Sequence, residues 1–334
     1  MGLDGAVRVC VVGAGAIGGV VGVRLAVAGG VTTSVLARGQ TLATLRAHGW
    51  RLRTAGGEIT TPVVASDDPA ELGPQDVVLL TVKAHALPGL APTLGPLLGP
   101  DTVVVPAVNG VPWWFFDGIG GAFDGLRLHA VDPTGSVAAA IPTARVVGCV
   151  VHMSASVDAP GVTRHHAGDG LILGEPAGGP SARVSALAEP LRRAGFAVTI
   201  SDRIQTDVWY KLWGNMTMNP ISALTGTTTD RILDDELVYG LVRAVMGEAA
   251  AIGARIGCPI AQTAEERSAV TRKLGVFKTS MLQDAEAGRP LELDALVTVV
   301  REIGVAVGVP TPSLDALLGL TRLAATQRGL YPTP

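Results

Sequence analysis

The stretch that decides the fold runs from Val7 to Gly18 and reads VRVCVVGAGAIG. Its first six residues are largely apolar and β-branched, which is typical of a buried strand. Glycines then interrupt the strand, and the apolar pattern that follows continues through Leu25 until Gly29 and Gly30. The order predicts a strand, a tight turn and a helix.

The turn itself consists of Gly13, Ala14, Gly15, Ala16, Ile17 and Gly18 and has the spacing G-x-G-x-x-G. In such a turn the first glycine permits the bend, the second lets the backbone approach a pyrophosphate, and the third allows close packing of helix and strand. Free N–H groups at the helix start face the phosphates. The sequence therefore predicts a dinucleotide site, with a simple glycine-rich connector as the alternative.

Arg38 selects the cofactor in this interpretation. NAD-dependent enzymes place an Asp or Glu about 20 residues after the turn, where it accepts hydrogen bonds from the ribose. This chain has Arg38 after its second β-rich run. A guanidinium is a permanent cation with only donor groups, which suits a 2′-phosphate. We predict NADPH rather than NADH, and the alternative is a solvated surface arginine.

The rest of the chain predicts two domains, an N-terminal Rossmann-type α/β domain over residues 1–202 and an all-helical domain over residues 203–334. Buried parallel strands are expected at 31–37, 76–82 and 102–108. Short strands at 146–157 and 168–174 suggest an antiparallel edge, with turns at Gly161 and Gly168. A helix over 182–194 and a strand over 197–201 complete the first domain.

Helical periodicity dominates beyond Asp202. The apolar residues between Leu237 and Met246 recur at i, i+3 and i+4, and this helix is expected to end at Gly257. A second helix is expected to start at Pro290 and to stop at Gly308.

Composition excludes several classes of function. The net charge is −3 and no run of basic residues occurs, which disfavours nucleic-acid binding. The three cysteines show no C-x-x-C spacing, and His165-His166 has no acidic or cysteine neighbours at useful spacing, so we expect no metal. We also expect a cytoplasmic protein without a membrane partner, since the N-terminus lacks a signal-peptide pattern. The sequence leaves open whether the protein forms a homodimer.

Polar residues near apolar segments are candidates for a site. Lys83 and Asn109 each follow an expected strand, where ligands of open sheets bind. Lys211, Asn215 and Asn219 recur at i, i+4 and i+8, which places them on one face of a helix. A third cluster contains Ser280 and Glu292. Strand-terminating, capping and buried structural roles are the alternatives.

Together these motifs resemble the ketopantoate reductase (2-dehydropantoate 2-reductase) family over essentially the whole chain. The resemblance rests on the glycine turn, Arg38, Thr-Val-Lys-Ala around Lys83, Asn109-Gly110, Lys-x-x-x-Asn-x-x-x-Asn-Pro from Lys211 to Pro220, and Ser280-Met-Leu-Gln-Asp with Glu292. The last two motifs are specific. The resemblance implies an NADPH-dependent reduction of a keto acid, most simply ketopantoate to pantoate in pantothenate biosynthesis. The resemblance also implies that this reaction takes place in a cleft between the two domains.

The resemblance also implies roles for individual residues. Lys211 would be the general acid, because hydride transfer to a ketone leaves negative charge on oxygen that an ammonium can stabilise and protonate. Asn215, Asn219 and Ser280 would hold the substrate, and Asn109 would lie between substrate and nicotinamide ribose. Glu292 would contact cofactor or substrate hydroxyl. Lys83 would sit beside the nicotinamide site, and Ser154 would offer its backbone to the cofactor.

Two features depart from the family pattern. Thr227-Thr228-Thr229 stands where the family uses a further asparagine, and Trp113-Trp114-Phe115-Phe116 follows Asn109 closely enough to reach a substrate, unless these rings fill core space. Both features leave open which keto acid is the substrate. The competing hypotheses are a β-hydroxyacid dehydrogenase-like oxidoreductase acting on another small acid and a non-catalytic NADPH-binding sensor.

Overall fold

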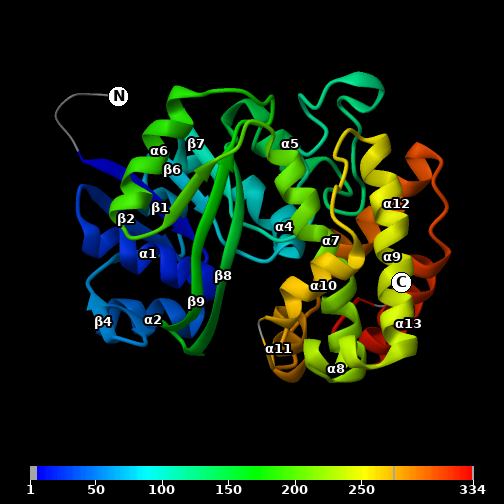
Figure 1. Ribbon diagram of the computed structural model, residues 1–334. Helices are drawn as coiled ribbons and strands as arrows, with labels where there is room; N and C mark the ends of the chain where they lie inside the picture. Colours follow the sequence, from blue (N-terminus) through cyan, green and yellow to red (C-terminus); the bar gives the residue numbers. More distant parts are fainter. Residues whose placement is uncertain (1–5, 274, 333–334) are drawn as a thin grey trace. The chain divides into compact units, whose positions relative to one another are not determined.

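The computed structural model describes residues 6–273 and 275–332. The chain divides into two compact units: unit 1 contains Met1–Leu126 and Thr134–Ile204, and unit 2 contains Arg127–Pro133 and Gln205–Pro334. This division differs from the predicted ranges 1–202 and 203–334 at the short segment Arg127–Pro133 and by two residues at the main boundary. Figure 1 labels many of the helices and strands of both units.

The first sheet of unit 1 is parallel and has the order β5-β2-β1-β6-β7. Its strands are β1 Val7–Val12, β2 Val31–Leu36, β5 Val64–Ser66, β6 Gln75–Leu80 and β7 Leu98–Pro106. The first connection is α1 Ala16–Ala28, as the glycine turn predicted, and the second is α2 Gly39–His48. Short helices follow at α3 Pro69–Leu72, α4 Leu87–Leu90 and α5 Ser136–Ala140. The architecture is the Rossmann-type α/β domain expected from the sequence.

A second sheet has the order β10-β9-β3-β4, with β8 paired to β9. Its strands are β3 Trp50–Thr54, β4 Gly57–Thr61, β8 Gly148–Ala159, β9 Val162–Gly174 and β10 Ala197–Ile200, and α6 Ala182–Arg193 precedes the last of them. β8 and β9 are long antiparallel neighbours, which Figure 1 shows side by side. The expected antiparallel edge is thus confirmed.

The turn expected at Gly168 is wrong. β9 continues through this residue to Gly174, and Gly168 takes a positive φ of 78° inside the strand. A Cβ there would stand 2.6 Å from the carbonyl oxygen of His152 on β8. The register of β8 and β9 shifts at this point, so the glycine forms a bulge and not a chain reversal.

Helix α1 packs between the two sheets because three of its glycines present no side chain. A Cβ on Gly19 would overlap Thr163 of β9, and one on Gly22 would overlap the ring of Trp50 on β3. Both partners are fully buried, and residues of both sheets form one hydrophobic core with α1. The third, Gly18, belongs to the turn. Close helix-sheet packing therefore fixes where the first turn of α1 lies.

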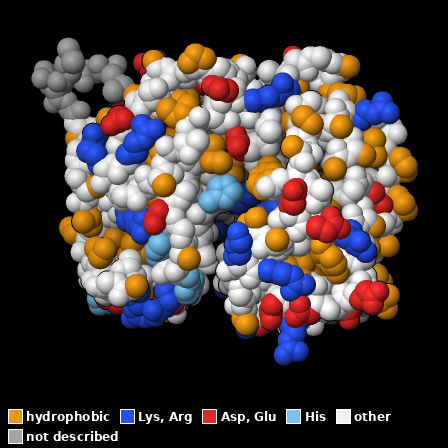
Figure 2. All heavy atoms as spheres, in the orientation of Figure 1, with side chains coloured by type: hydrophobic (Ala, Val, Ile, Leu, Met, Phe, Trp, Pro, Cys, Tyr) orange, Lys and Arg blue, Asp and Glu red, His pale blue; other side chains and the backbone are white. Residues whose placement is uncertain are grey.

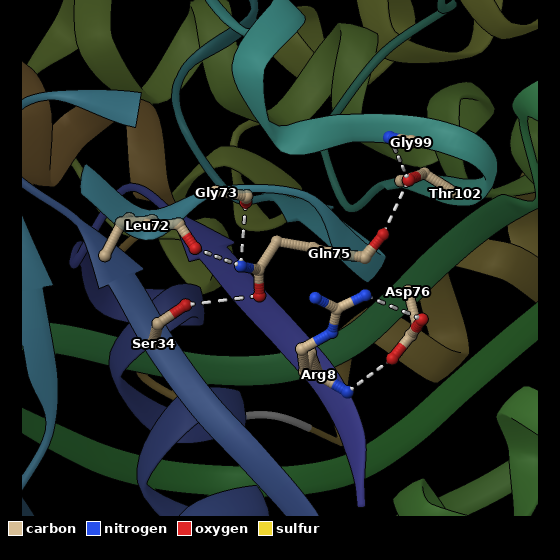
Figure 3. A network of polar contacts seen from close by, with 8 residues as sticks. All are labelled: Arg8, Ser34, Leu72, Gly73, Gln75, Asp76, Gly99 and Thr102. Atoms are coloured by element: carbon tan, nitrogen blue, oxygen red, sulfur yellow. Dashed lines mark hydrogen bonds and ion pairs between the residues drawn. The ribbon is translucent and has the colours of Figure 1, made fainter. Parts of the chain in front are cut away.

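A buried polar network joins the start of β6 to β2 and β7 (Figure 3). The Gln75 amide donates to the carbonyl oxygens of Leu72 and Gly73 at 2.8 and 2.9 Å and lies 3.4 Å from the Ser34 hydroxyl. The Thr102 hydroxyl of β7 donates to the Gln75 carbonyl oxygen at 2.5 Å. These bonds satisfy backbone groups where the β6–β7 register shifts after Gln75.

Within its described residues, 205–273 and 275–332, the main part of unit 2 is helical. Its elements are α7 Ile204–Thr225, α8 Thr229–Asp234, α9 Glu236–Arg255, α10 Ala264–Arg272, α11 Ser280–Glu286, the π-helix η6 Asp294–Thr298, α12 Val299–Val307 and α13 Pro312–Gln327. The expected stops at Gly257 and Gly308 are confirmed, since both glycines have positive φ. The expected start at Pro290 is wrong, because the helix begins at Leu293 and its first turns are of the π type.

Helix α9 alone, among the described residues, is long and apolar enough to cross a membrane by length and composition. It contacts α8, α10, α12 and α13 and buries the face that carries Val242, Val245, Met246, Ala249 and Ile252. Its Glu248 carboxylate accepts the N–H groups of Ser313 and Leu314 at 2.8 and 2.9 Å, which caps the start of α13. These contacts bury one face of α9, about a third of its apolar stretch, against other helices of unit 2.

Candidate active site

Apart from Ser154, the predicted residues of unit 1 lie along one edge of the first sheet, beyond the carboxyl ends of four neighbouring strands. The glycine turn follows β1, Arg38 follows β2, Lys83 follows β6 and Asn109 follows β7. The sheet hydrogen bonds continue past the strand ends, from Thr81 N–H to the Val12 carbonyl oxygen at 3.0 Å and from Ala107 N–H to that of Leu80 at 2.9 Å. This edge is where open α/β sheets bind ligands.

Two of the three turn glycines are required by packing within the protein. Gly13 has a φ of 102°, and a Cβ there would lie 2.7 Å from Val82 Cγ1. A Cβ on Gly18 would overlap the Gly13 carbonyl oxygen and stand 2.5 Å from the Thr81 hydroxyl. That hydroxyl donates to the Gly13 carbonyl oxygen at 2.7 Å, so it holds the turn closed. The sequence analysis missed Thr81, whose signal is one hydroxyl at the end of an apolar strand.

Gly15 is different, because no protein contact requires it. Its φ is −81°, and the nearest atom to an added Cβ is the Thr81 carbonyl oxygen at 4.0 Å. Gly15 is the N-cap of α1, and the first turn of that helix has no acidic residue and no side-chain cap. Open space before uncapped N–H groups suits an anionic group of a ligand. The turn therefore fits the pyrophosphate of a dinucleotide.

Arg38 lies at the N-cap of α2, and its side chain is exposed. Within the described part of the chain, no ion pair or side-chain hydrogen bond engages its guanidinium. Many other arginines of unit 1 are committed to carboxylates, as Arg183 is to Glu175 and Arg24 to Asp169. The Arg38 cation is thus available to an anionic ligand at the carboxyl edge.

The other residues of unit 1 that are predicted to contact the cofactor lie in different parts of the fold. Lys83 and Asn109 are half-buried at the edge, and Lys83 precedes a 3-10 turn that its carbonyl oxygen stabilises through Ala86 N–H. Ser154 lies on β8 of the second sheet, opposite Ala167 and next to the bulge at Gly168. The strand topology thus groups Lys83 and Asn109 with the glycine turn and puts Ser154 on a separate sheet.

Helix α7 carries Lys211, Asn215 and Asn219 as predicted, one turn apart. Two tryptophans fix its rotation: the Trp209 and Trp213 indole N–H groups donate to the carbonyl oxygens of Ala249 and Met246 on α9, at 3.3 and 2.8 Å. Both rings are buried. Because of the helix periodicity, Lys211, Asn215 and Asn219 lie on the face of α7 that is opposite these tryptophans.

The two asparagines of α7 have unused amide groups. Asn219 is 5% exposed, and no side-chain hydrogen bond joins it or Asn215 to the residues that the structure describes. Burying an amide without a partner costs free energy, which a bound ligand can offset by supplying that partner. The pattern favours a binding role over the alternative of a closed structural network.

The third cluster comes from α11 and the segment before η6. Thr279 is the N-cap of α11, and its hydroxyl accepts Leu282 N–H at 3.1 Å. The capping alternative for Ser280 is therefore wrong, and its half-buried hydroxyl occupies the first helical position. Glu292 is buried, with 6% of its surface exposed. A nearby lysine, Lys278, is exposed and paired with Glu286 at 2.7 Å.

Two sequence features have structural roles. All four rings of Trp113–Phe116 are buried in unit 1, where Phe115 and Phe116 make an edge-to-face contact at 5.1 Å, so they fill core space. In unit 2, Thr229 is buried and its N–H donates to the Phe277 carbonyl oxygen at 3.1 Å. The Ser222 hydroxyl donates to the carbonyl oxygen of Thr227 at 2.5 Å.

Charged side chains of both signs are interspersed on the face that Figure 2 shows. Several form surface pairs, such as Arg272 with Asp234 at 2.6 Å. Among the residues described, no group of three His, Cys, Asp or Glu side chains could hold a metal ion. His165 instead lies 2.7 Å from the Gly168 carbonyl oxygen and 3.4 Å from Arg24.

Comparison with known proteins gives matches over nearly the whole chain. The family model described as ketopantoate reductase PanE/ApbA matches residues 9–178, and the model described as its C terminal matches residues 203–325. A curated 2-dehydropantoate 2-reductase of Mesorhizobium japonicum is 47% identical over 97% of this chain and 99% of its own length.

Solved structures agree with these matches. A Ralstonia solanacearum protein provisionally named a ketopantoate reductase is 60% identical, with a TM-score of 0.94 over 98% of this chain and 100% of its own. The 2-dehydropantoate 2-reductase of Methylococcus capsulatus is 32% identical, with a TM-score of 0.81 over 96% of this chain and 98% of its own.

Proposed function

The chain belongs to the ketopantoate reductase family, and on this premise we propose that it reduces the ketone of 2-dehydropantoate to the alcohol of pantoate with NADPH. Its class is that of oxidoreductases acting on a 2-keto acid. The observation that carries the proposal is the presence of Lys211, Asn215 and Asn219 on one face of α7 in a chain that matches such a reductase end to end.

The choice of NADPH is supported by Arg38 and the glycine turn. Unit 1 offers an open approach at Gly15, uncapped N–H groups at the start of α1, and an arginine without an acidic partner among the described residues at the next strand. A guanidinium can pair with a 2′-phosphate in two parallel hydrogen bonds. Lys83 and Asn109, on the same edge, would contact the nicotinamide half, and Ser154 would offer its backbone.

We assign to Lys211 the transfer of a proton to the ketone oxygen of the substrate. The bound NADPH supplies the hydride, and the protein supplies position and field. The Lys211 ammonium would donate a hydrogen bond to the ketone oxygen, stabilise the negative charge that develops there, and pass its proton to that oxygen. The indole hydrogen bonds of Trp209 and Trp213 keep α7 from rotating about its axis, so the ammonium keeps its direction.

The remaining polar residues would hold the substrate. The amides of Asn215 and Asn219, which have no hydrogen-bond partner among the described residues, can each donate and accept, which suits a ligand with hydroxyl and carboxylate oxygens. The Ser280 hydroxyl, which does not cap α11, would join them, as would Asn109. The Glu292 carboxylate would accept a hydrogen bond from a hydroxyl of substrate or cofactor.

The experiment that tests the proposal follows the loss of NADPH absorbance with ketopantoate, a set of bulkier 2-keto acids, and no keto acid. Small 3-hydroxy acids with NADP⁺ form a separate arm. We expect turnover with ketopantoate and with few of the others. Turnover only with the 3-hydroxy acids would replace the proposal by a β-hydroxyacid dehydrogenase-like activity, and no turnover in any arm would favour a cofactor-binding sensor.

The three cysteines support a reducing, cytoplasmic location as part of the same proposal. Cys10, Cys149 and Cys258 are buried, and none of them forms a disulfide with another described residue. Burial raises the pKa of the Cys10 thiol to about 11, which keeps it protonated and unreactive.

A further inference from the structure

Arg267 of α10 is a half-buried cation that no carboxylate neutralises in the described chain. Its Nε atom is buried and has no hydrogen-bond partner. Neighbouring charges on α10 are engaged elsewhere: Glu266 accepts Thr263 N–H in a capping box, and Arg272 pairs with Asp234. A partly desolvated guanidinium without a counter-charge costs free energy, which a bound anion can offset.

The Arg267 guanidinium is held against α7. Its Cζ lies 5.4 Å from the centroid of the Tyr210 ring, within the range of a cation–π contact. A Cβ on Gly214 would lie 2.9 Å from its Nη2 and 3.3 Å from its Cζ. The absence of a side chain at Gly214 is therefore what makes room for the guanidinium on the surface of α7.

This position is next to Lys211. Tyr210 precedes Lys211 in the chain, and Gly214 follows it by three residues on the same helix. Side chains three apart on a helix have Cβ atoms about 5–6 Å apart. The Arg267 guanidinium thus lies against the same turn of α7 that carries the Lys211 side chain.

We propose that Arg267 binds the carboxylate of the substrate and so makes the enzyme selective for 2-keto acids over neutral ketones. This inference rests on the proposed function, in which Lys211 contacts the ketone oxygen. In a 2-keto acid the carboxylate is bonded directly to the ketone carbon, so a cation one helical turn from Lys211 lies in the range of that anion. The planar guanidinium suits a carboxylate, and Tyr210 and Gly214 fix its plane.

The first test compares Arg267→Gln with the wild type on ketopantoate and on its neutral primary amide. We expect KM for ketopantoate to rise about 10- to 100-fold, as when one charge-assisted hydrogen-bonded contact is lost, with little change in kcat and little change for the amide. The matched control is Arg243→Gln, because Arg243 lies over Tyr239 at 5.4 Å and pairs with Glu265 at 3.7 Å. This control should leave both substrates unchanged.

A second pair of variants guards against a folding defect. Gly214→Ala keeps the arginine and favours helix, yet its Cβ must displace the guanidinium. Gly214→Ala should raise KM for ketopantoate and leave KM for the neutral amide unchanged. Arg267→Lys keeps the charge without the planar fork and should recover part of the affinity. Equal losses on acid and amide in Arg267→Gln, or unchanged KM for the acid, would overturn the proposal.

Calorimetric binding of pantoate separates this proposal from the proposed function. The wild type should bind pantoate in the presence of NADP⁺, and Arg267→Gln should bind it about 10- to 100-fold more weakly. If the wild type reduces no keto acid, the proposed function fails while this titration still decides the role of Arg267. If it reduces ketopantoate and both proteins bind pantoate equally, only the role of Arg267 is refuted.

Discussion

At the scale of single residues, three kinds of polar group distinguish the candidate functional residues of the two units. The first are amides without partners, Asn215 and Asn219, and the second is a pair of cations without carboxylate partners among the described residues, Arg38 and Arg267. The third is Lys211, which α7 presents on the same face as the amides. The unsatisfied amides and unpaired arginines are groups that a polar ligand can satisfy, which is why they mark candidate binding residues better than the paired charges of the surface.

Replacing Lys211 by alanine tests the assigned acid. We expect Lys211→Ala to lower kcat about 100-fold or more, the range for loss of a general acid, with ketopantoate at saturation. Lys278→Ala is the control, since that lysine is exposed and ion-paired to Glu286. Near-normal turnover in Lys211→Ala would rule out the role.

Arg38 is expected to distinguish the two nicotinamide cofactors. Arg38→Ala removes a charge-assisted contact to the 2′-phosphate and should raise KM for NADPH about 10- to 100-fold, with KM for NADH unchanged. Initial rates with each cofactor measure the difference. A wild-type preference for NADH that persists in Arg38→Ala would contradict the NADPH proposal.

At the scale of elements, α1 shows how packing positions the cofactor turn. The helix lies between two sheets, and its glycines meet Thr163 and Trp50 where any side chain would overlap them. The uncapped first turn is therefore held at the sheet edge by contacts made farther along the helix.

Overpacking this interface should destabilise unit 1. Gly22→Ala places a methyl group against the buried Trp50 ring and should lower the free energy of unfolding by about 1–3 kcal/mol. Gly247→Ala is the matched control, because Gly247 is exposed within α9 and nothing lies within 4 Å of an added Cβ. It should stabilise by about 0.5–1 kcal/mol. Denaturant titration measures both, and equal effects would refute this account of α1.

At the scale of the whole molecule, ion pairs within unit 1 make its stability depend on pH. The Arg183 guanidinium donates to the Glu175 carboxylate at 2.6 and 2.7 Å and lowers the pKa of that carboxyl below its usual value. Partial burial opposes the shift at Asp76, but the Arg8 backbone N–H and guanidinium lower the pKa of that carboxyl, and the Arg164 guanidinium lowers the pKa of Asp158. All three carboxylates belong to unit 1.

A lowered carboxyl pKa contributes stability that is complete above the ordinary pKa and is lost as pH falls through the folded-state pKa. Acid should therefore weaken unit 1, beginning below about pH 4–5. Glu175→Gln should lower Tm at neutral pH and flatten the fall of Tm in acid, measured by calorimetry across the pH range. An acid dependence of Tm identical to that of the wild type would contradict this assignment.

Local patterns in the sequence determined the strand, turn and helix from Val7 onward, the helices that end at Gly257 and Gly308, and the shared face of Lys211, Asn215 and Asn219. Each depends on a period of a few residues or on the backbone preference of one glycine, which neighbours in the chain suffice to specify.

Only the tertiary structure decided the features that join distant segments. The β3–β4 hairpin pairs with β9, so Arg51 stands opposite Val162. Glu302 of α12 accepts the N–H groups of His129 and Ala130, which ties the segment Arg127–Pro133 to unit 2. The contact of Thr81 with the glycine turn and the position of Arg267 beside Gly214 also join residues that are distant in the sequence. Such contacts depend on which surfaces meet in the fold, and no local periodicity encodes that.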